Sequence, residues 1–257
     1  MTRLAIDQVL VLNDNYIYLL HDAVTGATAA VDPAEAEPVL ARLAERGWHL
    51  SHILITHHHA DHTGGNLALK AATDCTILGA AADAGRIPGL DRGLQDGEDI
   101  ELGSARAEVL LVPGHTSAHL AYWFAAEQAL FCGDTLFSLG CGRLFEGSPA
   151  QMWASLERLR ALPDDCRVFC AHEYTQSNAR FAATVDAANP ALAARIAEVE
   201  ALRTAHKPTV PSLMAEERAT NPFLRADQPA LAAAVGLTGA PPAEVFAEIR
   251  RRKDTFR

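Results

Sequence analysis

The sequence predicts a mixed α/β fold followed by a helical segment. Apolar runs and alternating stretches of strand length recur over the first two-thirds of the 257 residues, whereas strand signals vanish from about residue 173. Within the first part, four apolar runs end directly in residues that can bind a metal ion. We therefore expect a metal-binding α/β domain over residues 1–172 and a helical C-terminal domain over residues 173–257.

Strands are predicted wherever apolar runs or alternation are bounded by Asn, Asp or Gly. The predicted strands are residues 3–12, 15–21, 27–31, 52–56, 75–79, 105–112, 119–125, 128–133 and 167–171. Between two of them, Pro33–Arg46 predicts a helix with Asp32 as N-cap and Gly47 as its stop. Further helices are predicted from Gly64 to about residue 72, after the capping-box sequence Ser148-Pro149-Ala150-Gln151, from Asn189-Pro190, and over 242–255.

The bulk composition is that of an ordinary soluble globular protein, with 49% hydrophobic and 21% charged residues. No signal peptide is evident, and no run approaches the roughly 18 apolar residues that a membrane span needs. Five cysteines without a Cys-x-x-Cys pair argue for a reducing cytoplasm. A net charge of −10 disfavours nucleic acid as partner. We expect a cytoplasmic monomer that binds neither nucleic acid nor membrane.

Candidate metal ligands follow four of the predicted strands. Buried strands that each end in a ligand bring those ligands together at one edge of a sheet. In extended chain, residues two apart point to the same side, so His57 and His59 can converge while His58 points away. Together the candidates are five imidazoles and two carboxylates: His57, His59, Asp61, His62, His115, Asp134 and His172. That set is too large for one tetrahedral zinc and suits two ions with open positions.

The segment Thr56 to His62 resembles the Thr-His-x-His-x-Asp-His signature of the metallo-β-lactamase superfamily. Within it, the chain is most similar to the glyoxalase II family, the hydroxyacylglutathione hydrolases. The similarity extends to Asp14-Asn15-Tyr16, Ala30-Val31-Asp32-Pro33, Pro113-Gly114-His115-Thr116, Gly133-Asp134-Thr135-Leu136-Phe137, Gly140-Cys141-Gly142-Arg143, His172-Glu173-Tyr174-Thr175 and Asn221-Pro222-Phe223. The resemblance implies a four-layer αββα metallo-β-lactamase sandwich with an α-helical C-terminal domain.

The resemblance also implies a role for each ligand. One metal takes His57, His59 and His115, and the other takes Asp61, His62 and His172. Asp134 bridges them, and Asp61 and Asp134 are the catalytic carboxylates. We expect two divalent ions, zinc in the first place, with iron or manganese compatible with the same donors.

The chemistry of two close cations suits thioester hydrolysis. Such an ion lowers the pKa of bound water from about 15.7 to about 7, which gives a hydroxide nucleophile at neutral pH. A thiolate, whose conjugate acid has a pKa of about 8.5, leaves without a dedicated general acid. By resemblance, the substrate is S-D-lactoylglutathione or a related 2-hydroxyacylglutathione. It is cleaved to glutathione and D-lactate in the second step of methylglyoxal detoxification.

Substrate-binding candidates lie in the last predicted helix, where Arg250 and Lys253 are three apart and share a face. The alternative is a solvated basic helix end that favours the helix dipole. The resemblance implies that this Arg-x-x-Lys pair holds the glycine carboxylate of glutathione, and that Arg143 and Tyr174 contact its peptide. Phe145 stands where some members have Tyr, so weaker glutathione affinity is expected.

Three other interpretations remain open. A mononuclear-iron persulfide dioxygenase of the same superfamily resembles the chain around the histidine motif, but such proteins generally lack the helical extension at residues 173–257. A metal-binding module without catalysis would require a closed site. A nuclease of the superfamily is disfavoured by the acidic charge. We expect structural roles for His119, Cys132, Cys141 and Cys170.

Overall fold

A computed structural model describes residues 4–256 of the protein, so the predicted strand residue Arg3 lies outside the described part. The chain forms two compact units. The first contains Met1–Leu111 and Ala118–Gly133, and the second contains Val112–Ser117 and Asp134–Arg257. The expected division after residue 172 is a different one and stays a prediction.

The first unit begins with a six-stranded mixed sheet in the order β1-β2-β3-β4-β5-β6. Its strands are β1 Leu4–Val11, β2 Asn15–Asp22, β3 Thr28–Val31, β4 His52–Leu54, β5 Thr76–Ala80 and β6 Arg92–Leu94. The pairing is antiparallel from β1 to β3 and parallel from β3 to β6. Four further strands pair antiparallel in chain order: β7 Asp99–Leu102, β8 Ala105–Leu111, β9 Leu120–Phe124 and β10 Ala129–Gly133.

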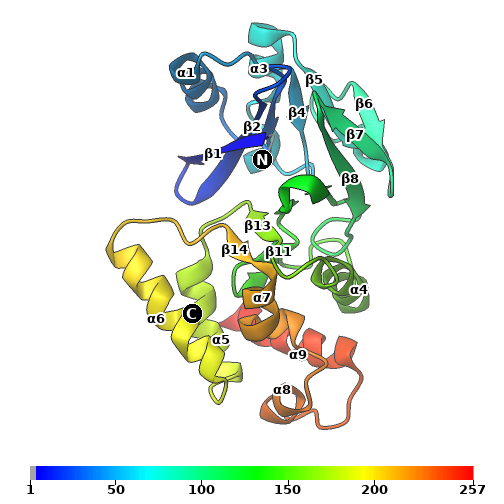
Figure 1. The fold of residues 1–257 in the computed structure, drawn as a ribbon. Coiled ribbons are helices and arrows are strands. Elements are labelled where there is room, and N and C mark those ends of the chain that lie inside the picture. Colours follow the sequence, from blue (N-terminus) through cyan, green and yellow to red (C-terminus); the bar gives the residue numbers. More distant parts are fainter. Residues whose placement is uncertain (1–3, 257) are drawn as a thin grey trace. The chain divides into compact units, whose positions relative to one another are not determined.

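Side-chain alternation in β2 shows how this unit is layered. Ile17 and Leu19 belong to the buried cluster that includes Val39 and Leu43 of helix α1. Tyr18, between them, points to the other face, where its ring lies 5.4 Å from that of Phe131 in β10. One face of the mixed sheet is therefore covered by α1 (Ala36–Arg46) and α3 (Asn66–Thr73), and the other faces the second set of strands (Figure 1).

The helix boundaries correct two predictions. Helix α1 begins at Ala36 rather than Pro33, and Asp32 is not its N-cap, because the cap position is Glu35 and makes no side-chain cap bond. Gly47 ends the helix in the left-handed conformation, as predicted, with φ of 66°. The helix expected from Gly64 to about residue 72 is α3, which begins at Asn66, and an unpredicted single turn, α2 (Ala60–Thr63), precedes it.

The second unit is mainly helical. Its helices are α4 Pro149–Arg160, α5 Thr175–Val185, α6 Pro190–Thr204, α7 Met214–Thr220, α8 Pro229–Ala234 and α9 Pro242–Thr255. The capping box at Ser148 and Gln151 and the N-cap at Asn189 are both confirmed. The unit also contains two short antiparallel strand pairs: β11 Leu136–Phe137 with β12 Gly140–Cys141, and β13 Arg167–Cys170 with β14 Ser212–Leu213. The expectation that strands end near residue 173 was therefore wrong for β14.

Apolar contacts position α5, α6 and α9 within this unit. Ala179 and Ala182 of α5 share a buried cluster with Leu192 and Val199 of α6, and the two helices lie side by side (Figure 1). Phe246 of α9 lies 6.3 Å from Trp153 of α4 and 5.9 Å from Phe223, ring centre to ring centre. The described chain also contains three 3₁₀ turns, two in the first unit and one in the second: Ala81–Asp83, Ala125–Glu127 and Pro222–Leu224.

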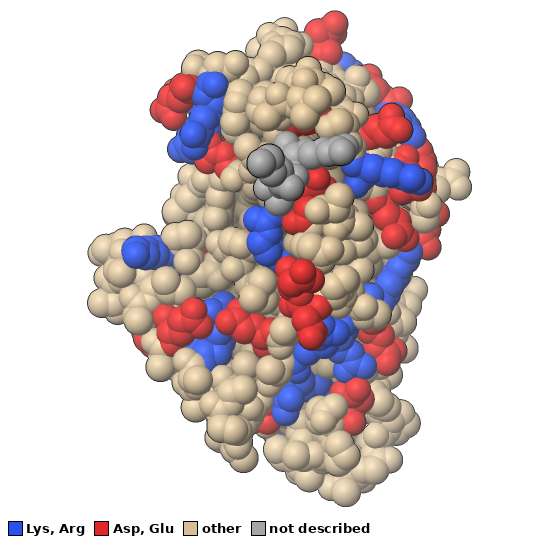
Figure 2. Space-filling model, in the orientation of Figure 1, with Lys and Arg blue, Asp and Glu red and all other residues tan. Residues whose placement is uncertain are grey.

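The surface mixes charges of both signs. On the face drawn in Figure 2, acidic and basic side chains are interspersed. Over residues 4–256, no helix has the length and apolar character needed to cross a membrane.

Candidate active site

The loop after β4 is fixed by bonds from β9. The backbone N–H of Leu120 donates to the carbonyl of Thr56 at 2.8 Å, and the hydroxyl of the buried Tyr122 donates to the carbonyl of Ile55 at 2.7 Å. Burial raises the pKa of Tyr122, which keeps that hydroxyl a donor. The start of the histidine motif is therefore rigidly placed.

Asp32 orients one of the candidate ligands. Its carboxylate accepts hydrogen bonds from the backbone N–H and the hydroxyl of Thr56, at 2.7 and 2.6 Å. It also lies 3.1 Å from Nδ1 of the buried His62. Because a carboxylate accepts, this contact assigns the proton of His62 to Nδ1 and directs the Nε2 lone pair towards an ion. Asp32 adopts a positive φ of 49°, which is unusual for a residue other than glycine.

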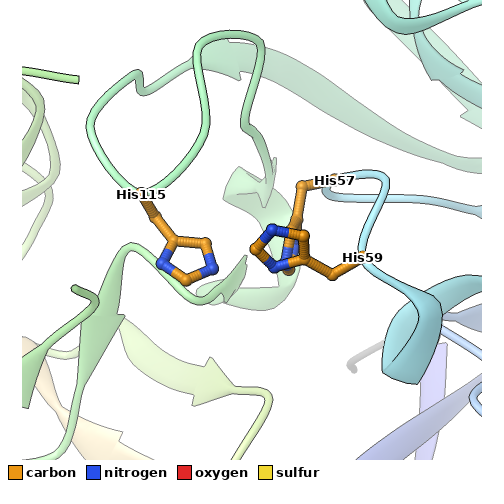
Figure 3. Close-up of side chains that lie close together, drawn as sticks. All are labelled: His57, His59 and His115. Atoms are coloured by element: carbon orange, nitrogen blue, oxygen red, sulfur yellow. The ribbon is translucent and has the colours of Figure 1, made fainter. Parts of the chain in front are cut away.

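His57 and His59 converge, as the strand geometry predicts. Nε2 of His57 lies 3.0 Å from Nδ1 of His59. Ligand atoms of His57, His59 and His115 all lie within 4.8 Å of one another, with the imidazoles pointing together (Figure 3). The ring of the buried His119 stacks on that of His57 at 4.7 Å, consistent with the structural role expected for it.

His58 is directed elsewhere. Its Nδ1 lies 3.1 Å from the carboxylate of Asp83, a fully buried residue that also accepts hydrogen bonds from Arg86. The side chain of His58 is therefore engaged with a structural carboxylate, in agreement with its predicted exclusion from the ligand set.

Asp61 is held by the first residue of β2. The side-chain amide of the buried Asn15 donates to the Oδ2 atom of Asp61 at 3.2 Å and to its backbone carbonyl at 3.1 Å. The same Oδ2 atom lies 3.6 Å from Nε2 of His62. Asp61, His62 and His172 form a second group whose ligand atoms lie within 4.8 Å of one another.

The two carboxylate oxygens of Asp134 face two different histidines. Its Oδ2 lies 3.4 Å from Nε2 of His115, and its Oδ1 lies 3.4 Å from Nε2 of His172. Nδ1 of His115 lies 2.9 Å from the backbone carbonyl of Arg143, which can only accept, so Nε2 is the atom left for a metal. Gly142 leaves room for both residues, since a Cβ atom there would lie 3.0 Å from Nδ1 of His115 and 2.0 Å from the backbone carbonyl oxygen of Asp134.

The imidazole and carboxylate donors described above fit divalent zinc, iron or manganese. The nearby cysteines do not join them. Burial raises the pKa of Cys141 to about 11 and that of Cys170 to about 12, so both thiols stay protonated at neutral pH. All five cysteines are buried, and none forms a disulfide bond.

The aromatic substrate candidates border the histidines. Tyr174 is 38% exposed, and its ring stacks on that of His172 at 4.7 Å. Phe145 is 62% exposed, and its ring lies 5.1 Å from that of His115. Arg143, between Gly142 and Leu144, is also exposed.

The basic pair of α9 is less exposed than a solvated helix end would be. Arg250 is only 5% exposed; it donates to the carbonyl of Cys141 at 2.8 Å and pairs with Asp254 at 2.9 Å. Lys253 is half-buried and donates to the hydroxyl and carbonyl oxygens of Ser177, each at 3.3 Å. Burial, followed by the charges of Arg250, Arg180 and Arg143, lowers the pKa of Lys253 to about 8.

Comparisons with known proteins agree with this arrangement. Residues 9–172 match the family model described as the metallo-beta-lactamase superfamily, and residues 173–256 match that described as the hydroxyacylglutathione hydrolase C-terminus. A hydroxyacylglutathione hydrolase from Methylococcus capsulatus is 65% identical over 99% of both chains. One from Rhodospirillum rubrum is 58% identical over the full length of both.

Solved structures share the fold. The crystal structure of ETHE1 from Myxococcus xanthus has a TM-score of 0.71 and 26% identity, covering 98% of this chain and 92% of that one. TTHA1623, crystallised in a di-iron-bound form, has a TM-score of 0.56 and 30% identity over 65% of this chain and 91% of its own.

The fold and the histidine motif place the chain in the metallo-β-lactamase superfamily, with two sheets and a helical C-terminal region. Within it, the chain belongs to the hydroxyacylglutathione hydrolases, the glyoxalase II enzymes.

Three residues of the site were not predicted from the sequence to belong to it: Asn15 and Asp83, to which no role was assigned, and Asp32, which was expected to be a helix cap. Asn15 and Asp32 stood in motifs shared with the family, but only the fold brings Asn15 to Asp61 and Asp32 to His62. No local pattern marks Asp83, which reaches His58 from a 3₁₀ turn.

Proposed function

We propose that the protein hydrolyses S-D-lactoylglutathione and related 2-hydroxyacylglutathiones at a centre of two divalent metal ions. The products are glutathione and D-lactate, as in the second step of methylglyoxal detoxification. The observation that carries the dinuclear centre is the carboxylate of Asp134, whose two oxygens face Nε2 of two different histidines. A single carboxylate between two imidazoles suits a bridge between two ions.

In this proposal His57, His59 and His115 hold one ion, Asp61, His62 and His172 hold the other, and Asp134 contributes to both. The ligand-atom groups around His57 and around Asp61 support the division. Zinc is the first expectation, with iron and manganese as alternatives. When bound, two such ions would lower the pKa of water and stabilise negative charge on a carbonyl oxygen.

The chain itself keeps these donors in working orientation. Asp32 and the carbonyl of Arg143 accept from Nδ1 of His62 and of His115, which leaves both Nε2 atoms for coordination. Asn15 holds the carboxylate of Asp61 at its position. Asp61 and Asp134 are therefore proposed as the catalytic carboxylates. No side chain has to protonate the departing sulfur, because a thiolate is a stable leaving group at neutral pH.

The glutathione part of the substrate is assigned to the second unit. Tyr174 and Arg143 are exposed for contact with the peptide, and Arg250 and Lys253 contribute positive charge to the glycine carboxylate. Binding an anion beside Lys253 would raise its lowered pKa, so binding is favoured while the ammonium is protonated. Phe145 has no hydroxyl to offer, which supports the expected weaker affinity.

The persulfide dioxygenase alternative loses its basis at residues 173–256, which match the hydroxyacylglutathione hydrolase C-terminus. We also propose a monomer and a cytoplasmic location, the latter supported by the absence of disulfide bonds among the five cysteines. Light scattering of the purified protein would measure its mass directly.

Thiol release from S-D-lactoylglutathione, measured beside the metal content of the same sample, tests the proposed function. We expect turnover together with close to two ions per chain. Oxygen uptake with glutathione persulfide, in place of thiol release from the thioester, would overturn the proposal. Full activity with one ion per chain would remove the dinuclear part alone.

A further inference from the structure

Asn221 belongs to the segment Asn221-Pro222-Phe223, to which the proposed function assigns no role. Its side chain is fully buried. The side-chain amide donates to the backbone carbonyls of Phe137 and Gly140, at 3.1 and 3.0 Å. These two residues face each other across the β11–β12 hairpin, directly before and after its turn. One amide therefore fixes both strands of the hairpin where the turn begins and ends.

Side chains of α5 and α7 fix the turn itself. The buried Leu139 adopts a positive φ of 57°, which a leucine rarely takes unless its surroundings impose it. Its backbone N–H donates to the carboxylate of Glu217 at 2.9 Å. The amide of Asn178 donates to the carbonyl of Ser138 at 3.1 Å. The protein around the hairpin thus holds the turn in one conformation.

The hairpin supports three of the proposed metal ligands, all in the second unit. Asp134 lies two residues before β11. Two residues after β12, the carbonyl of Arg143 lies 2.9 Å from Nδ1 of His115. The ring of Phe137 in β11 lies 5.9 Å from that of His172, edge to face at 82°. A displaced hairpin would therefore move Asp134 and the supports of both histidines.

We infer that Asn221 is a positioning residue for the proposed dinuclear centre, and that it acts through the β11–β12 hairpin. The inference rests on the proposed function. The oxygens of Asp134 lie 3.4 Å from Nε2 of His115 and 3.4 Å from Nε2 of His172. A carboxylate that serves two ions has to meet both at once, and such sites require their side chains within about 0.5 Å of the productive geometry. Asn221 provides that accuracy from outside the ligand set.

The alternative role for Asn221 is that of a helix cap alone. It is the N-cap of the 3₁₀ turn Pro222–Leu224, and its side-chain oxygen accepts from the backbone N–H of Phe223 at 3.0 Å. Aspartate is as good an N-cap as asparagine, but its carboxylate has no N–H to donate. Asn221→Asp therefore keeps the cap and loses both bonds to the hairpin, so it separates the two roles.

The zinc affinity of the apoprotein, measured by competition with a chromophoric chelator, is the main test. We expect about tenfold weaker binding in both Asn221→Asp and Asn221→Ala, the lower end of the effect of losing a contact that supports a ligand. Wild-type affinity in Asn221→Asp would overturn the inference. Asn178→Ala removes one bond to the turn instead of two and should weaken binding less. Should the Asn221 variants not fold, wild-type affinity in Asn178→Ala would overturn the inference instead.

Leu231→Ala is the control for a general loss of stability. It truncates a fully buried side chain of α8, which should lower Tm, whereas zinc affinity should stay that of wild type. Zinc binding weakened equally in Leu231→Ala and Asn221→Asp would show that the effect of Asn221 is only structural.

Electron paramagnetic resonance of the manganese-loaded protein supplies a second readout. The magnetic coupling between two close ions depends on the groups that bridge them, so the signal should change in Asn221→Asp and not in Leu231→Ala. An unchanged signal in Asn221→Asp would contradict the inference. A wild type that binds fewer than two ions would refute the dinuclear centre itself, whereas two ions in wild type and a normal zinc affinity in Asn221→Asp would refute only the role of Asn221.

Discussion

Asp134 connects the two proposed ligand sets through one side chain, so its removal tests them jointly. In Asp134→Ala each proposed ion loses a ligand and the two cations lose the negative charge between them. We expect metal content and kcat to fall together, as measured by elemental analysis and thiol release. A variant with two ions and near-normal kcat would show that Asp134 does not bridge.

His58→Ala is the matched control for that experiment. His58 lies within the same motif, but its Nδ1 faces Asp83. Metal content and most of the activity should therefore be retained. A collapse of metal content in this control would mean that the loop positions its side chains differently from the structure.

Asp32 offers a test of ligand orientation without removal of any ligand. In Asp32→Asn the side chain keeps its size, but its amide can no longer accept from all of Thr56 N–H, Thr56 hydroxyl and His62 Nδ1. Loss of such a supporting contact weakens metal binding by about 10- to 100-fold. Metal titration of the apoprotein would measure the change, with the exposed Asp165→Asn as control. Equal metal affinity in wild type and Asp32→Asn would sink the orienting role.

The convergence of the candidate ligands could be predicted from the sequence, whereas the residues that support them could not. His57, His59 and Asp61 lie within one short motif, where the two-residue repeat of an extended chain decides which side chains converge. Asp32 was predicted to be a helix cap because it precedes a helix-forming run. Its actual role depends on a positive φ and on a contact with His62, 30 residues away, neither of which is encoded locally.

The hairpin β11–β12 lies in the chain between the proposed metal ligand Asp134 and the substrate candidate Arg143, and a buried glutamate accepts a hydrogen bond from its turn. Glu217 of α7 is fully buried and accepts from the backbone N–H of Leu139, in the turn, and from the side chain of Asn221, each at 2.9 Å. Asn221 also donates to the carbonyls of Phe137 and Gly140. Burial is the largest influence on Glu217 and raises its pKa.

The raised pKa predicts a pH-dependent stability difference for Glu217→Gln. The folded state binds the proton of Glu217 more tightly than the unfolded state, so this group lowers stability as pH rises from its unfolded pKa through its folded pKa. Glutamine keeps an acceptor for Leu139 and has no charge to bury. The free energy of unfolding of Glu217→Gln relative to wild type, from urea denaturation, should therefore be higher at pH 8 than at pH 4. A difference independent of pH, or of opposite slope, would contradict the assignment.

Element prediction succeeded for the long apolar strands and for the longer helices that a cap or a proline marks, and it missed α5, which has no side-chain cap. Helices α4, α6 and α9 were predicted with their starts because a cap or a proline marks each one. Strands β11, β12 and β14 have two residues each, too few for any periodicity to show. In the β11–β12 hairpin, side chains distant in sequence bond to the backbone: Glu217 to Leu139 and Asn221 to Phe137.

At the scale of the whole chain, the sequence pointed to both the fold and its family. The change from strands to helices and the signature from Thr56 to His62 predicted a metallo-β-lactamase fold with a helical C-terminal region, and the family matches confirm it. The compact units could not be predicted in this way. Their division passes through residues 112–117 and 134, so it follows contacts between distant segments rather than a change in composition.

Metal removal tests the molecule as a whole, because the proposed ligands come from many separate segments of the chain. Prolonged chelation should abolish thiol release, and zinc, iron or manganese added back singly should show which ion restores it. An ion present at about 1,000 times its dissociation constant stabilises the folded state by about 4 kcal/mol. For a chain of this size, that corresponds to a Tm lower by about 8–16 °C in the apoprotein. Calorimetry of the same samples would measure it. An apoprotein that keeps its activity, or melts at the temperature of the metal-loaded protein, would show that ions do not join these ligands.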